Sequence, residues 1–194
     1  MKRLIVGISG ASGVIYGIRL LEVLRDVSDV EAHLVLSNAA AQTIGLETEF
    51  SAAEVEALAG VVYRFRDIAA AISSGSFRTS GMVVIPCSMK TLAGIAHSYS
   101  DNLLLRAADV TLKDRRKLVL VPRETPLHLG HLRLLQQVVE MGAIVAPPMP
   151  AFYHRPRTLD DVINQTVNRV LDLFGIELPQ DLFQRWQGAG GGDV

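Results

Sequence analysis

The chain has 194 residues, of which 49% are hydrophobic, and its formal net charge is −1. This length favours one domain with a sizeable core. The balanced charge argues against a nucleic-acid-binding surface, and no apolar run approaches the roughly 20 residues that a membrane span needs. High apolar content with little charge repulsion predicts a homo-oligomer.

Cysteine content and the N-terminal residues indicate a cytoplasmic protein. Cys87 is the sole cysteine, so the chain has neither a disulfide framework nor a cysteine-based metal site. Lys2 and Arg3 lead directly into a predicted strand, without the apolar segment of a cleavable signal peptide. We therefore expect a cytoplasmic location and no bound metal.

The stretch from Leu4 to Gly13, LIVGISGASG, predicts a buried strand and a tight turn, followed by a helix from Val14 to about Arg25. Three glycines, three residues apart, leave room where a phosphate or another backbone must come close. The unpaired N–H groups of a helix N-terminus attract anions. The pattern lacks the lysine of a P-loop and is not G-x-G-x-x-G. It indicates a mononucleotide or phosphate site, with a plain strand-to-helix turn as the alternative.

Strand and helix patterns alternate along the rest of the chain, which is typical of an α/β fold with a doubly wound parallel sheet. Further strands are predicted at Val30–Leu36, Met82–Pro86, Leu118–Val121 and Ala143–Ala146. Further helices are predicted at Ala39–Gly45, Ser51–Leu58, Cys87–Ala96, Asp101–Leu112, Leu127–Met141 and Leu159–Leu173. The segment Leu46–Phe50 is expected to be an acidic loop. Residues 60–81 predict no regular element, and their Ser/Gly cluster at 73–76 suggests a loop near a ligand or a surface connection.

Hydroxyl side chains recur where predicted strands end. Ligands of a doubly wound sheet bind outside the carboxyl ends of its strands. Each of these hydroxyls alone is typical of a helix cap. Together they predict a site at one sheet edge, formed by Ser9, Ser12, Ser37, Ser88 and Thr91.

Two charged residues and two histidines follow the fourth buried strand. Arg123 and Glu124 lie between prolines that stiffen the backbone, which favours a role in a site. His128 and His131 have the i, i+3 spacing of shared metal ligands, but no acidic third ligand is nearby in the sequence. We interpret them as helix-surface histidines.

Motifs over nearly the whole chain resemble, in the same order, the UbiX/Pad1 family of flavin prenyltransferases, close to the enterobacterial-type UbiX sequences. The motifs are GISGASG, Ser37, LETEF, PCSMKT, RAADVTLK, VPRETP, AFYHRP, Asn168 with Arg169, and the late RW pair. The resemblance implies a Rossmann-like flavoprotein fold and dodecamers with active sites between subunits. We expect one flavoprotein domain over residues 1–187 and a disordered Gly-rich tail over 188–194.

The resemblance also implies a reaction. Members of the family transfer a dimethylallyl group from dimethylallyl monophosphate to N5 and C6 of reduced FMN. The prenylated FMN serves UbiD-type decarboxylases, here in ubiquinone biosynthesis.

Site residues follow from the resemblance, position by position. FMN contacts are implied for Gly10, Ala11, Ser12, Ser37, Ser88, Met89, Lys90, Thr91, Arg106 and Arg123. Tyr153 and Arg169 would hold dimethylallyl phosphate, aided by Lys113 and by Arg123 of another subunit. Ser12 would join these cations in meeting the charge of the leaving phosphate.

The resemblance assigns proton transfer to Glu47 and Glu124. We expect Glu47 to be the base and Glu124 the acid or relay. Trp186 would stabilise the allyl cation through its π system.

Two alternative functions stay open. A flavin-dependent decarboxylase of the Cys-decarboxylase type would share the fold and the Gly/Ser turn but act on a carboxylated substrate itself. A non-catalytic carrier would bind FMN and hand it on, and would have no need of converging cations.

Overall fold

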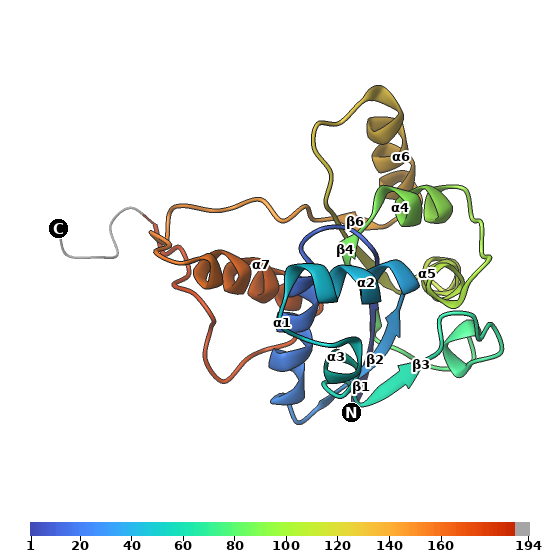
Figure 1. Ribbon diagram of the computed structural model, residues 1–194, viewed down its shortest axis with the longest axis horizontal. Coiled ribbons are helices and arrows are strands. Elements are labelled where there is room, and N and C mark those ends of the chain that lie inside the picture. Colours follow the sequence, from blue (N-terminus) through green and yellow to red (C-terminus); the bar gives the residue numbers. More distant parts are fainter. Residues whose placement is uncertain (189–194) are drawn as a thin grey trace.

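Residues 1–188, which the computed structural model describes, form a six-stranded parallel sheet with helices on both faces (Figure 1). The strand order is β3-β2-β1-β4-β5-β6. The strands are β1 (Lys2–Ile8), β2 (Val30–Leu36), β3 (Val61–Tyr63), β4 (Gly81–Cys87), β5 (Lys117–Pro122) and β6 (Ile144–Val145). The order reverses between β1 and β4, and such a switch point opens a crevice for ligands at the carboxyl ends of the strands.

Seven α-helices and one 3-10 turn connect the strands of the described part. They are α1 (Val14–Arg25), α2 (Asn38–Glu47), α3 (Ala52–Glu56), η1 (Ala71–Ser73), α4 (Met89–Ala96), α5 (Leu103–Lys113), α6 (Leu129–Glu140) and α7 (Leu159–Leu173). The α/β prediction is confirmed. None of the helices in residues 1–188 has the length and apolar character needed to cross a bilayer. Of the expected tail at 188–194, all but Gly188 lies outside the described residues.

The two faces of the sheet bury separate cores, which explains why the strands read as continuous apolar runs. Leu4, Val6 and Ile8 of β1 pack in one cluster with α1, α2 and α7. Ile5, between them, belongs to the other cluster, with α4, α5 and Val138 of α6. Because side chains alternate along a strand, one apolar run supplies both layers.

Most predicted elements are confirmed, with bounds that shift by one or two residues. The acidic loop at 46–50 is wrong in its first part, because Leu46 and Glu47 form the last turn of α2. The capping box of Ser51 and Glu54 is present, although α3 ends at Glu56. Strand β3 and the η1 turn lie in the region for which no regular element was predicted.

Candidate functional site

Four turns meet at the carboxyl edge of the sheet, and hydrogen bonds between them fix their positions. The N–H of Ser37 donates to the carbonyl of Ile8 at 3.0 Å, which joins the ends of β2 and β1. The N–H of Arg123 donates to Cys87 at 3.2 Å, which joins β5 to β4. The predicted convergence of these segments at one edge is therefore confirmed.

Ser9 is a structural link in this edge. Its side chain is buried, and its hydroxyl donates to the carbonyl of Pro86 at 2.9 Å. The same oxygen accepts the N–H of Ser88 at 2.7 Å. Ser9 therefore ties the turn after β1 to the turn after β4, and the expectation that its hydroxyl faces a ligand is wrong.

Ser37 and Ser88 cap the helices that begin at this edge. Ser37 Oγ accepts the N–H of Ala40 at 3.0 Å, and Ser88 Oγ accepts the N–H of Thr91 at 3.2 Å. Ser88 also donates to Thr91 Oγ1 at 3.1 Å. Each cap contributes about 1 kcal/mol to stability. The caps leave the first N–H groups of α2 and α4 facing the crevice, as at any helix start.

Glu47 lies at the N-terminus of α1. Its Oε2 accepts the N–H of Gly13 at 2.8 Å and that of Val14 at 3.4 Å. Burial raises the pKa of Glu47, but hydrogen bonds from Ser12 and these two N–H groups outweigh it, with help from the charge of Arg123. The net pKa is lowered, so Glu47 is ionised near neutral pH, and the anion cradle predicted at this turn holds a carboxylate of the chain itself.

The glycines of the first turn serve the backbone. Gly13 has φ of +93°, in the left-handed region that favours glycine. At Gly10, an added Cβ would overlap the Cβ of Ala39 at the start of α2. The glycine pattern could allow close approach either of a phosphate or of another backbone. The structure shows that it allows close approach of another backbone.

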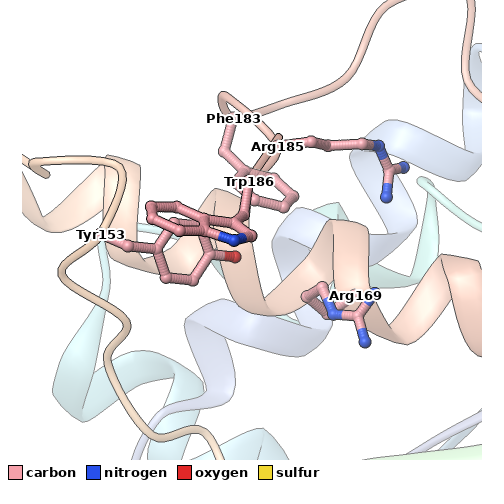
Figure 2. A pocket seen from close by; sticks show the side chains of 5 residues that line it. All are labelled: Tyr153, Arg169, Phe183, Arg185 and Trp186. Atoms are coloured by element: carbon pink, nitrogen blue, oxygen red, sulfur yellow. The ribbon is translucent and has the colours of Figure 1, made fainter. Parts of the chain in front are cut away.

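A pocket of about 510 Å³ lies beside α7, between Arg169 of that helix and residues from the segments before and after it (Figure 2). Tyr153 contacts Trp186 edge to face, with ring centroids 6.0 Å apart, and Phe183 at 6.5 Å. Arg169 and Arg185 complete the lining. Aromatic rings beside guanidinium groups suit a ligand with an apolar end and an anionic end.

The two arginines of this pocket differ in how far they are engaged. Arg169 donates one hydrogen bond, from Nη1 to Asp172 at 2.8 Å, and its side chain is 55% exposed. Arg185 is bound to two carboxylates. The sequence alone gave neither Phe183 nor Arg185 a role, although both stand beside Trp186 in the same short segment.

Two predicted site residues lie on α5, at opposite ends of that helix. Lys113 ends α5, four residues before β5 begins, so it stands near the amino ends of the strands, where its Nζ pairs with Asp114 at 2.8 Å. Arg106, on the same helix, pairs with Asp109 at 2.8 Å and donates to the carbonyl of Ser73. Lys113 can therefore reach a site at the carboxyl edge only from another copy of the chain, whereas Arg106 lies in the first turn of α5, whose start bonds to Phe65 just after β3.

The remaining predicted residues, except Ala11, are exposed or partly exposed at the edge. Glu124 Oε1 accepts the N–H of Thr125 at 3.0 Å, and Arg123 is exposed beside it. Met89 and Lys90 form the first turn of α4. Ala11 is buried in the first turn.

The two histidines of α6 stack on each other, with ring centroids 3.6 Å apart. His128 caps the helix, since its Nδ1 accepts the N–H of Gly130 at 3.0 Å. Within residues 1–188, no group of three or more His, Cys, Asp or Glu side chains is arranged to hold a metal ion.

Comparison with known proteins identifies the family of this chain. Residues 1–171 match the family model described as Flavoprotein. The flavin prenyltransferase UbiX of Escherichia coli K12 is 72% identical over 189 residues, which cover 97% of this chain and all of that protein. This chain belongs to the UbiX branch of the flavoprotein family.

Solved structures of UbiX proteins have the same fold. A dodecameric FMN-dependent UbiX-like decarboxylase from Escherichia coli O157:H7 superposes with a TM-score of 0.93 at 56% identity, covering 96% of this chain and all of that one. A UbiX protein in complex with FMN and dimethylallyl pyrophosphate gives a TM-score of 0.92 at 49% identity, with 96% and 98% coverage.

The carboxyl edge fits the phosphate of a flavin mononucleotide. Two helix N-termini open there, and the cations of Lys90 and Arg123 are exposed beside them. Such N–H groups and cations are the donors that bind phosphate in other proteins. The residues at this edge therefore fit the phosphate of FMN.

Proposed function

We propose that this protein is a flavin prenyltransferase that transfers a dimethylallyl group from dimethylallyl monophosphate to N5 and C6 of reduced FMN. The observation that carries the proposal is the pocket of Tyr153, Arg169 and Trp186, which pairs aromatic rings with an available guanidinium. An allyl group with a phosphate has those two ends. The 72% identity to a flavin prenyltransferase UbiX supports this substrate pair.

FMN would bind at the carboxyl edge of the sheet, and it supplies the nucleophilic ring atoms that accept the prenyl group. The turn of Gly10, Ala11 and Ser12 would contact it from β1, and Ser37 from β2. The residues Ser88 to Thr91 would contact it from the start of α4, and Arg123 from the end of β5.

The phosphate of dimethylallyl monophosphate would leave from the side of the pocket where Arg169 lies. Among the described residues Arg169 donates only to Asp172, so its other N–H groups can bind the phosphate oxygens, and Tyr153 adds a hydroxyl donor. Fixed donors stabilise charge that develops on a leaving oxygen more than they stabilise the ground state. This explains how a monophosphate can depart without a metal.

Lys113 would contribute from a neighbouring subunit. Its position at the end of α5 keeps it away from the carboxyl edge of its own chain. The solved relative described as dodecameric offers such neighbours. We therefore propose a homo-oligomer, with twelve subunits as in that relative, whose sites form between copies.

Two carboxylates would move protons. Glu47 is ionised, so it could accept the proton that C6 of the flavin loses when the new ring closes. To do so, Glu47 would give up a hydrogen bond from the N-terminal turn of α1. Glu124, exposed on the turn after β5, would protonate the departing phosphate or relay a proton to it. The prenylated flavin would then pass to a UbiD-type decarboxylase.

Mass spectrometry of the released flavin tests the function. The purified protein is incubated without oxygen with reduced FMN and dimethylallyl monophosphate. We expect FMN enlarged by one dimethylallyl unit. Recovery of unchanged FMN would instead support the carrier alternative.

The decarboxylase alternative has its own assay. The protein alone is incubated with 4-hydroxybenzoate, and carbon dioxide release is measured. We expect none, because the relative that is 72% identical is a flavin prenyltransferase. Release of carbon dioxide with no flavin alkylation would replace the proposal.

A further inference from the structure

Asp172, on the last turn of α7, binds both arginines of the aromatic pocket. Its Oδ2 accepts Nη1 of Arg169 and Nη1 of Arg185, each at 2.8 Å. Its Oδ1 accepts Nη2 of Arg185 at 2.7 Å. One carboxylate therefore connects a residue of α7 with a residue of the segment that follows it.

Arg185 is held on its other side by Asp181. Its Nε and Nη2 donate to the two carboxylate oxygens of Asp181, both at 2.6 Å. All three guanidinium nitrogens are thus engaged with carboxylates, and bidentate pairs of this kind fix geometry as well as charge. In Figure 2 the Arg185 guanidinium points away from the ring of Trp186.

Asn168 adds a second fastening between α7 and the segment. This side chain is buried, and its Oδ1 accepts the N–H of Leu182 at 2.7 Å. Its Nδ2 lies 3.3 Å from Asp181. The segment 181–186 is consequently attached to α7 at three points, through Leu182, Asp181 and Arg185.

The two arginines of the pocket have different roles. Arg169 donates one N–H to Asp172 and its side chain is 55% exposed, so its other N–H groups can bind an anion. Arg185 neutralises the Asp172 charge that would otherwise repel a phosphate at Arg169 or hold Arg169 for itself. Arg185 also precedes Trp186, the ring that closes the pocket against Tyr153.

We propose that Asp172 is a positioning residue, which acts through Arg185 to hold Trp186 over the pocket while leaving Arg169 available to the phosphate. The identity of that phosphate as dimethylallyl monophosphate rests on the proposed function. The fastening itself rests only on the contacts of Asp172, Arg185 and Asn168.

The sole tryptophan of the chain gives a direct readout. Fluorescence anisotropy of the flavin-free protein reports how firmly Trp186 is held. Affinity for dimethylallyl monophosphate and for inorganic phosphate is measured by calorimetry, and KM and kcat by flavin alkylation. The variants are Arg185→Met, Arg185→Lys and Asp172→Asn, with Asp160→Asn as the matched control because it removes an exposed carboxylate from the first turn of α7, at the far end of the helix from Asp172.

For Arg185→Met we expect a lower anisotropy and a rise of about tenfold in the Kd and KM for dimethylallyl monophosphate, the change that roughly 1.4 kcal/mol of lost attraction produces. Arg185→Lys restores the charge without the fork, so it recovers affinity more than anisotropy. Asp160→Asn stays within about twofold of the unmodified protein in both measurements.

Asp172→Asn distinguishes positioning from direct phosphate binding by Arg185. If Asp172 positions the segment, the anisotropy falls as in Arg185→Met. Unchanged anisotropy with tighter phosphate binding would make Arg185 a ligand and overturn the proposal. So would an Arg185→Met variant that matches the unmodified protein in both measurements.

The anisotropy and calorimetry need no turnover. If the expected changes occur while the unmodified protein alkylates no FMN, the fastening stands and the proposed function fails. If alkylation proceeds and Arg185→Met alters neither measurement, the proposed function stands and the positioning role of Asp172 fails.

Discussion

Glu47 joins two roles in one side chain, because it caps α1 and is our choice of base. Its lowered pKa means that the folded state favours the carboxylate. This contribution to stability is complete above the ordinary glutamate pKa of about 4.3 and is lost as the pH falls through the lowered value. A Glu47→Gln variant lacks it at every pH.

We therefore expect Glu47→Gln to be less stable than the unmodified protein at pH 7, with the difference shrinking below about pH 4. Urea denaturation at the two pH values measures this. In the alkylation assay the variant should bind FMN but stall before the C6 bond is complete. Normal product formation would remove Glu47 from the role of base.

Arg169 offers a prediction that separates the two ligands. Arg169→Ala removes the exposed guanidinium of the aromatic pocket, and a charge-assisted hydrogen bond is worth about 1.5–3 kcal/mol. We expect KM for dimethylallyl monophosphate to rise about 10- to 100-fold, while FMN affinity, measured by flavin fluorescence, stays unchanged. Loss of FMN binding would place Arg169 at the flavin instead.

The residue-level predictions succeeded where a side chain acts locally. Ser37 and Ser88 follow strands and precede helices, so capping could be predicted from the sequence. Ser9 could not be distinguished from them, because its partners at Pro86 and Ser88 are about 80 positions away in the chain. The same applies to Glu47, whose partners lie more than 30 residues earlier.

At the scale of elements, α1 packs closely on the sheet at Gly17. A Cβ there would overlap the carbonyl oxygen of Ile85 in β4 and press on Ile8. Gly45, in α2, has open space around its Cβ position. Two glycines within helices therefore have opposite consequences.

We expect Gly17→Ala to destabilise the protein by about 1–3 kcal/mol through overpacking. Gly45→Ala, the matched control, should stabilise it by up to about 1 kcal/mol through helix propensity. Thermal unfolding of both variants measures the difference. Equal effects would show that α1 can move away from β4 without cost.

Long elements were predicted well because a periodic pattern repeats over several turns. Helix α7 has the predicted bounds, and Thr158 caps it with Asp161. Strand β3 was missed, since three half-exposed residues on a sheet edge give neither alternation nor a buried run. Glu47 was placed in a loop because the polar residues Thr48 and Glu49 follow it, so the last turn of α2 was not recognised.

The whole molecule leaves apolar side chains uncovered on α6, which projects from the body in Figure 1. Leu129, Leu132 and Val139 are each about half exposed or more. A soluble chain seldom leaves such a face open unless it contacts a partner. This agrees with the oligomer predicted from composition and charge.

We expect light scattering to give a mass several times that of one chain. The double variant Leu129→Glu/Leu132→Glu should shift the distribution to smaller assemblies and lower the alkylation rate, because Lys113 would lose its neighbouring site. A monodisperse monomer with full activity would contradict both expectations.

The carboxylate at the start of α1 has a consequence for the catalytic cycle. Since Glu47 satisfies that helix end from within the chain, the turn after β1 needs no nucleotide to keep its shape. A prenyltransferase that releases prenylated FMN has an empty flavin site after every turnover. The turn after β1 keeps its shape in that empty state, because the flavin is a substrate and product of the enzyme rather than a resident cofactor.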